Sequence, residues 1–180
     1  MPRHGSTHWS DELTNGLGHT ETMKVRVKLS GAPLAYTLAL VEGTNEPYKA
    51  FGKEVWSEER GISLALREML FMRTSIINQC PTCLSGHVVS GRRRGVTDEQ
   101  IEALEDPSTW SGVFDAPTSS ALELADEMAG KDSHELDPLL IADLRLHFSE
   151  QELGEIILLC GQANLNNRAG NAAKQLLGEQ

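Results

Sequence analysis

The sequence lacks a cysteine framework, a long apolar run and an excess of positive charge. Its 180 residues contain three cysteines, too few for a secreted fold held together by disulfides. No apolar run approaches the roughly 20 residues that span a bilayer, and residues 1–20 lack the apolar core of a secretory signal. We therefore expect a cytoplasmic protein.

Positive charge is scarce, because 16 Lys and Arg stand against 26 Asp and Glu, a formal net charge of −10. A chain this acidic repels phosphate backbones and anionic lipid headgroups. We therefore expect no nucleic-acid partner and no membrane partner. The length suits one domain with a sizeable core.

The apolar pattern predicts an all-α protein of seven or eight helices, forming a single CxxC-containing domain over residues 31–180. Residues 1–30 are expected to be a flexible leader or an arm, in which residues 25–29 alternate like a strand. The most apolar segment, 63–78, leaves little polar face and should be a buried helix. Residues 106–117 are expected to be a loop. Further helices are expected at 34–41, 47–56, 82–93, 97–104, 118–129, 138–147 and 149–177.

The most informative motif is Cys80-Pro81-Thr82-Cys83. Pro81 suits the first turn of a helix, so the cysteines lie at i and i+3 on one face, where their sulfurs can approach disulfide distance. A helix N-terminus stabilises a thiolate, which is the reactive form of cysteine. A CxxC in a reducing compartment is therefore expected to be catalytic or metal-binding.

His87 lies four residues after Cys83 and so shares its helical face. It can accept the Cys83 proton or stabilise the thiolate as an imidazolium, which favours Cys83 as the attacking thiol and Cys80 as the resolving thiol. The helix dipole favours Cys80 instead, so the residues alone leave this assignment open.

A structural zinc site is the main alternative for this motif. Cys80, Cys83 and His87 give three ligands, whereas a closed zinc site has four. Cys160 is the remaining thiol, but it lies on an apolar stripe with Leu153 and is interpreted as a small core residue.

Glu68 interrupts the most apolar helix of the chain. A buried carboxylate is costly unless it is paired or protonated, and such a group suits a general base. The alternative is a structural ion pair, for which Arg67, Arg73 and Arg168 are possible partners. The spacing does not decide between these interpretations.

Two other polar groups are interpreted as structural. The apolar stripe of the last helix, Leu153, Ile157 and Cys160, continues into Asn164, Arg168 and Asn171, and we favour a satisfied hydrogen-bond cluster there over a site wall. The arginines at 92–94 are expected to be a solvated helix end that complements the helix dipole.

The combination of these motifs resembles a known family. Glu68 within Leu66-Arg67-Glu68-Met69-Leu70, the CxxC twelve residues later and His87 are similar to the alkylhydroperoxidase D-like branch of the carboxymuconolactone decarboxylase superfamily. Segments 144–153 and 164–168 resemble the later helices of that family. The similarity covers roughly residues 33–177.

This resemblance implies an all-helical fold that assembles as a trimer or hexamer. It implies reduction of hydroperoxides without a metal or organic cofactor, using an external dithiol as reductant. By motif position Cys83 attacks, Cys80 resolves, and Glu68 and His87 relay the proton. The best-known peroxidases of the family carry His immediately before the second cysteine, whereas this chain has Thr82.

Three functions follow as hypotheses. The first is a thiol peroxidase that reduces a small hydroperoxide through a dithiol–disulfide cycle. The second is a lyase or isomerase like carboxymuconolactone decarboxylase, in which His87 and Glu68 transfer protons and the cysteines are incidental. The third is a non-catalytic oligomer whose CxxC senses redox state.

Overall fold

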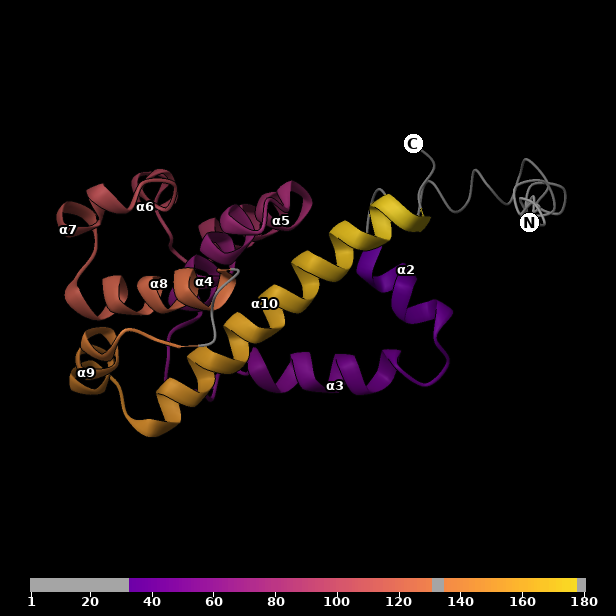
Figure 1. Ribbon diagram of the computed structural model, residues 1–180, viewed down its shortest axis with the longest axis horizontal. Coiled ribbons are helices and arrows are strands. Elements are labelled where there is room, and N and C mark those ends of the chain that lie inside the picture. Colours follow the sequence, from indigo (N-terminus) through magenta and orange to yellow (C-terminus); the bar gives the residue numbers. More distant parts are fainter. Residues whose placement is uncertain (1–32, 131–134, 178–180) are drawn as a thin grey trace, which may run out of the picture.

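Every regular element is a helix in the computed structural model, which describes residues 33–130 and 135–177 (Figure 1). The all-α expectation is confirmed. The expected leader or arm of residues 1–30 lies outside the described residues. The elements are α2 (Pro33–Leu40), α3 (Asn45–Val55), α4 (Leu64–Ile77), α5 (Pro81–Arg93), α6 (Asp98–Ala103), the short 3₁₀ helix η1 (Pro107–Thr109), α7 (Trp110–Val113), α8 (Ala116–Ala129), α9 (Pro138–His147) and α10 (Glu150–Leu177).

Helix α4 is the centre of the fold, as its apolar sequence predicts. Ser63 caps it by accepting a hydrogen bond from the Leu66 N–H, and every residue from Leu66 to Ser75 is buried. α4 packs against α5, α8 and α10, which together surround it. A charged residue on α4 is therefore held away from water unless it reaches a partner.

The segment expected to be a loop, 106–117, is largely helical. It contains η1 and α7, and α8 begins at Ala116 instead of residue 118. Trp110 anchors this segment, since its indole N–H donates to the Ala103 carbonyl at 2.8 Å and its side chain is buried. The elements are too short to show an apolar period, which is why the sequence pattern missed them.

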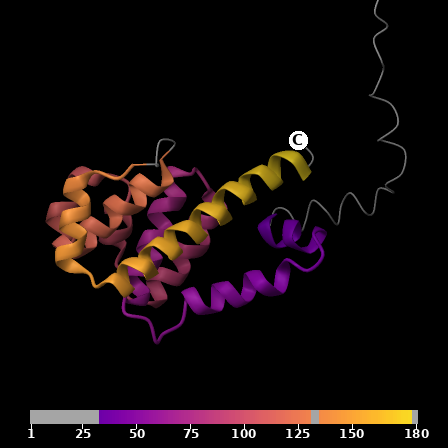
Figure 2. The same cartoon turned by 60° about the horizontal axis from the view of Figure 1, so that its bottom comes forward.

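Helix α10 runs diagonally across the molecule, and α2 and α3 lie along it away from the other helices (Figures 1 and 2). Two polar contacts link α3 and its C-terminal cap to α10: Trp56 Nε1 donates to Gln162 Oε1 at 3.0 Å, and the Tyr48 hydroxyl bonds Asn166 Oδ1.

The expected apolar stripe of α10 was wrong at Ile157, which is 48% exposed. The buried ridge instead contains Ile156, Leu159, Cys160 and Ala163.

None of the helices in the described ranges combines the length and apolar character needed to cross a bilayer.

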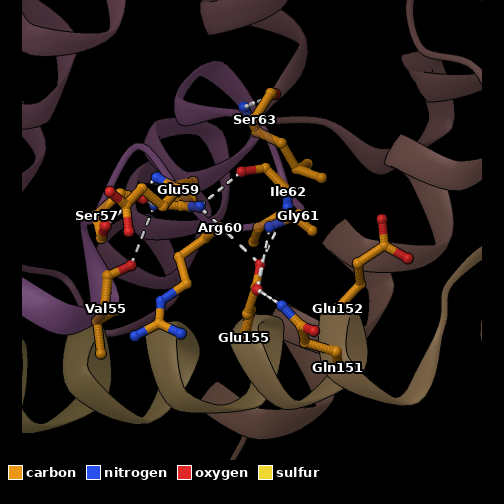
Figure 3. A network of polar contacts seen from close by, with 12 residues as sticks. Val55, Ser57, Glu59, Arg60, Gly61, Ile62, Ser63, Gln151, Glu152 and Glu155 are labelled. Atoms are coloured by element: carbon orange, nitrogen blue, oxygen red, sulfur yellow. Dashed lines mark hydrogen bonds and ion pairs between the residues drawn. The ribbon is translucent and has the colours of Figure 1, made fainter.

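Glu155 of α10 bonds the segment that connects α3 to α4 (Figure 3). Its carboxylate accepts hydrogen bonds from the N–H groups of Gly61 and Ile62, at 3.1 and 3.0 Å, and from the Gln151 side chain at 3.0 Å. Burial opposes ionisation of Glu155, but these bonds outweigh it, and the pKa of the carboxyl lies below its ordinary value. The folded state therefore stabilises the ionised form of Glu155 more than the unfolded chain does.

This lowered pKa predicts an acid-dependent contribution to stability. The stabilisation by Glu155 is present above its unfolded pKa of roughly 4.3 and is lost as the pH falls through the lower folded value. We expect Glu155→Gln to reduce the free energy of unfolding by about 1–2 kcal/mol at pH 7 and by much less near pH 3. Urea unfolding across this pH range measures the difference, with Glu58→Gln in the same connection as control, since Glu58 is exposed. A pH-independent difference would contradict the assignment.

Candidate functional site

The CxxC motif lies at the start of α5, as expected. Cys80 is the N-cap residue, and Pro81 occupies the first turn. The preceding Gln79 has a φ of 52°, a left-handed conformation that is uncommon for a residue other than glycine. The Asn171 side chain holds this bend by donating to the Asn78 and Gln79 carbonyls at 2.9 and 3.4 Å. The fold thus fixes the backbone that leads into the cysteines.

Cys80 and Cys83 form a disulfide, with their Cα atoms 5.4 Å apart. The two sulfurs differ in access, because Cys80 is 1% exposed whereas Cys83 is half-buried and lines a pocket. A reagent in that pocket therefore meets Cys83 first. This difference in burial is independent of the helix-dipole argument and favours Cys83 as the attacking thiol.

Glu68 and His87 meet between α4 and α5. His87 Nδ1 lies 2.6 Å from Glu68 Oε2, while the other carboxylate oxygen accepts hydrogen bonds from Ser90 Oγ at 2.6 Å and Arg94 Nη1 at 2.5 Å. The Glu68 side chain is 1% exposed. Three polar side chains thus converge on one buried carboxyl group and give both of its oxygens a hydrogen-bond partner.

Two aromatic rings, 6.0 Å apart, pack against the His87 imidazole. Phe71 of α4 stacks on one side with ring centroids 3.7 Å apart, and Trp56 stacks at 5.6 Å. The Arg94 guanidinium lies over the Trp56 ring, 5.1 Å from its centroid. These contacts fix the orientation of the imidazole ring.

A pocket of about 270 Å³ joins the thiol to the imidazole. One wall is the start of α2, and the others come from α4, α5 and α10. Its lining residues are Pro33, Leu34, Ala35, Phe71, Thr82, Cys83, Gly86, His87, Ser90 and Asn166. Cys83 and His87 therefore face the same cavity, whose remaining lining is partly apolar.

The partners expected for Glu68 in a purely structural role were wrong. Arg73 pairs with Asp126 at 2.5 Å, Arg67 donates to the Ser57 and Ile62 carbonyls, and Arg168 donates to the Ala129 carbonyl at 2.6 Å. The cationic side chain that pairs with Glu68 is that of Arg94. The expectation that all three arginines at 92–94 are a solvated helix end was therefore wrong at Arg94 and holds for the exposed Arg92 and Arg93.

The polar end of α10 is a hydrogen-bond cluster, as favoured from the sequence. Asn78 Nδ2 donates to Asn164 Oδ1 at 2.8 Å, and Arg168 Nε donates to Asn78 Oδ1 at 3.1 Å. Asn164 also donates to the Met128 carbonyl, which ties α10 to α8. These side chains join the ends of α4 and α8 to α10.

The donors required for the zinc alternative do not gather at this motif. Over residues 33–130 and 135–177, no three or more His, Cys, Asp and Glu side chains lie close enough together to hold a metal ion. Cys160 is fully buried in the core, next to Thr74. Burial raises the pKa of its thiol to about 12, so it stays protonated at neutral pH.

These environments predict three different thiol reactivities after reduction of the disulfide. We expect Cys83 to react fastest with a thiol reagent, Cys80 more slowly, and Cys160 only after unfolding, because the reactive thiolate needs both ionisation and access. Mass spectrometry of peptides after timed alkylation measures each rate. Rapid labelling of Cys160 in the native protein, or Cys80 reacting before Cys83, would contradict this order.

Four residues of the site were missed from the sequence: Phe71, Trp56, Ser90 and Arg94. A signal for the last two was present, because residues 83, 87, 90 and 94 follow one another at the 4, 3 and 4 spacing of a single helical face. The aromatic pair gave no comparable signal, since the rings come from α4 and from the end of α3 and meet only in the folded chain.

Residues 44–127 match the carboxymuconolactone decarboxylase family. YdfG of Bacillus subtilis, an uncharacterized protein, is 26% identical over 117 residues, which cover 64% of this chain and 78% of YdfG. Uncharacterized protein 4 in the cox locus of Paracoccus denitrificans is 28% identical over 103 residues, covering 56% of this chain and 92% of that protein.

Solved structures share the fold. An uncharacterized peroxidase-related protein from Silicibacter sp. TM1040 superposes with a TM-score of 0.68 at 23% identity, covering 86% of this chain and 83% of that one. The alkylhydroperoxidase AhpD core of a peroxidase-related protein from Ralstonia eutropha JMP134 gives 0.66 at 21% identity, covering 85% and 80%. The resemblance inferred from the sequence is confirmed.

Proposed function

We propose that this chain, a carboxymuconolactone decarboxylase-family protein with the alkylhydroperoxidase D-like fold, is a peroxidase that reduces hydroperoxides through Cys80 and Cys83. The observation that carries the proposal is one pocket that contains both Cys83 and a His87 held by the buried Glu68. A thiol, a proton acceptor and an orienting anion are the parts that an activated cysteine nucleophile needs. Cys80 and Cys83 are joined as a disulfide in the folded chain.

The proton relay follows from the hydrogen bonds. Because Glu68 engages Nδ1 of His87, the Nε2 atom is left to take the proton of the Cys83 thiol, directly or through water. Glu68 then balances the imidazolium charge, and the aromatic rings fix the orientation of the imidazole. The result is a thiolate–imidazolium pair beside the cavity.

The redox steps balance as a two-electron cycle. The Cys83 thiolate attacks the terminal oxygen of a hydroperoxide, and the O–O bond breaks. Cys83 is thereby oxidised to a sulfenic acid, and the departing alkoxide takes from His87 the proton that Cys83 gave up and leaves as an alcohol. The Cys80 sulfur then displaces the sulfenic oxygen as water and forms the disulfide. An external dithiol reduces the pair by exchange, becoming oxidised itself.

Thr82 cannot act as the acid or base that a histidine at this position supplies. Its hydroxyl lines the pocket and bonds Lys174 of α10, so this side of the motif carries a fixed cation. Proton transfer is therefore assigned to His87 alone.

The direct test is the stoichiometry of thiol loss. Reduced protein is mixed with one equivalent of cumene hydroperoxide, and the remaining thiols are counted after unfolding. We expect two of the three thiols to be lost, with Cys80–Cys83 as the new disulfide and Cys160 still reduced. Retention of all three thiols, or oxidation confined to Cys160, would refute the peroxidase assignment.

We also propose that the protein is a homo-oligomer, a trimer or hexamer. Helix α3 contributes no buried residue, and apolar side chains remain exposed on α3 and on the facing part of α10. They are Phe51, Ile157, Leu158 and Leu165, which are 38–51% exposed. Sedimentation equilibrium decides the assembly: a mass of one 19.7 kDa chain would contradict the proposal.

A further inference from the structure

Arg94 contacts two of the three groups that hold the His87 imidazole, Glu68 and Trp56. Its Nη1 atom bonds Glu68 Oε1 at 2.5 Å, and its guanidinium lies over the Trp56 ring that stacks on His87. Glu68 in turn bonds His87 Nδ1. One guanidinium therefore links the carboxylate that bonds the imidazole to the indole that packs beside it.

We propose that Arg94 is a positioning residue of the thiol site, which holds Glu68 as an anion and thereby lets His87 stabilise the Cys83 thiolate. This inference rests on the proposed function, because it concerns the same site. Arg94 is not among the residues that line the pocket, and its side chain bonds Glu68 and lies over Trp56, so it acts through these two residues.

Glu68 is buried between α4 and α5. A carboxylate that is 1% exposed has little water to stabilise its charge, so it keeps that charge only with a cation and hydrogen-bond donors nearby. Ser90 supplies a neutral donor, and His87 must gain and lose its own proton during the cycle. Arg94 is the permanent cation among these partners, since guanidinium does not deprotonate in proteins.

Without the guanidinium the buried carboxylate gains stability by taking up a proton, and a neutral carboxylic acid does not balance an imidazolium. Removing the positive charge also removes its direct attraction for an anion at Cys83. Both effects destabilise the Cys83 thiolate, so both raise the pH at which Cys83 becomes reactive.

The neighbouring arginines lack these contacts. Arg92 pairs with Asp98 at an exposed position, and Arg93 is exposed on the same helical turn. The Arg94 side chain is only 31% exposed and turns back toward α4. This contrast makes Arg93 a matched control for the charge of the helix end.

Among the described residues, two other ionisable side chains bond residues that line the pocket, and they stay the same in every variant. Lys174 of α10 bonds Thr82, and Tyr48 of α3 bonds Asn166. Burial raises the pKa of Tyr48 above its ordinary value, so it remains neutral over the range tested. The α2 wall contributes only Pro33, Leu34 and Ala35.

The test measures the rate of Cys83 alkylation by iodoacetamide against pH in reduced full-length protein, with peptide mass spectrometry as readout. Arg94→Met removes the charge but keeps an apolar stem and a sulfur for contact with Trp56. We expect its half-maximal pH to rise by about one unit, which corresponds to a roughly tenfold slower reaction at pH values well below the half-maximal pH of the parent. Arg94→Lys should recover most of the loss because it restores the charge, and Arg93→Met should match the parent.

Several results would overturn the inference. Arg94 does not set the pH at which Cys83 becomes reactive if the Arg94→Met curve coincides with that of the parent or shifts to lower pH. The same conclusion follows if Arg93→Met shows an equal shift. Loss of stability alone would lower the folded fraction, measured by circular dichroism, without moving the half-maximal pH. Failure of the parent to lose thiols to peroxide would instead refute the proposed function, and the alkylation curves would still report on Arg94.

Discussion

Cys83→Ser is expected to abolish peroxide reduction, with a loss of at least about 1,000-fold, because a hydroxyl does not form the anion that attacks the O–O bond. The substitution removes one sulfur at a half-buried position, so the fold should remain intact. Consumption of cumene hydroperoxide in the presence of a dithiol measures the rate, and circular dichroism checks the fold.

Cys80→Ser is the matched comparison for Cys83→Ser. Because Cys80 is buried and is assigned the resolving step, this variant should still consume one equivalent of peroxide and then stop, with Cys83 held as a sulfenic acid that dimedone traps. If Cys83→Ser gave the single turnover and Cys80→Ser gave none, the two cysteine roles would be reversed.

His87→Phe is expected to reduce the rate of Cys83 oxidation by about 100- to 10,000-fold at pH 7, the range typical of a lost general base. A phenyl ring can replace the imidazole against Phe71 and Trp56, so the aromatic packing survives while the proton acceptor is lost. Stopped-flow oxidation of reduced protein measures the single turnover.

The pH dependence distinguishes a base from a structural residue. In His87→Phe the rate should rise with pH until hydroxide ionises Cys83 directly, and so approach the parent rate in alkaline solution. A deficit that stays constant at every pH would mean that His87 only shapes the pocket. An unchanged rate at pH 7 would remove His87 from the mechanism.

The sequence predicted the parts of the site that lie one helical turn apart. Cys80, Cys83 and His87 belong to the same helix, so their spacing determines that they share a face. The contact between Glu68 and His87 crosses from α4 to α5, and the sequence supplied it only through the family resemblance. Local spacing cannot determine how two helices pack against each other.

The partner of Glu68 was mistaken for a related reason. Arg67 and Arg73 are close to Glu68 in sequence, but positions i−1 and i+5 on a helix point to different sides, and both arginines reach other elements. Arg94 is 26 residues away, at the end of a run of three arginines. Such a run is typical of an exposed helix end, so its single inward-facing member could not be told apart from the others by pattern alone.

The central claim is that the site stabilises the Cys83 thiolate, and the ionisation of Cys83 tests this most directly. In a Cys80→Ser, Cys160→Ala variant Cys83 is the only thiol, so the ultraviolet absorbance of the thiolate against pH reports on this residue alone. We predict half-ionisation at least one pH unit below the value of about 8.5 for free cysteine. Half-ionisation at or above about 8.5 would contradict the account.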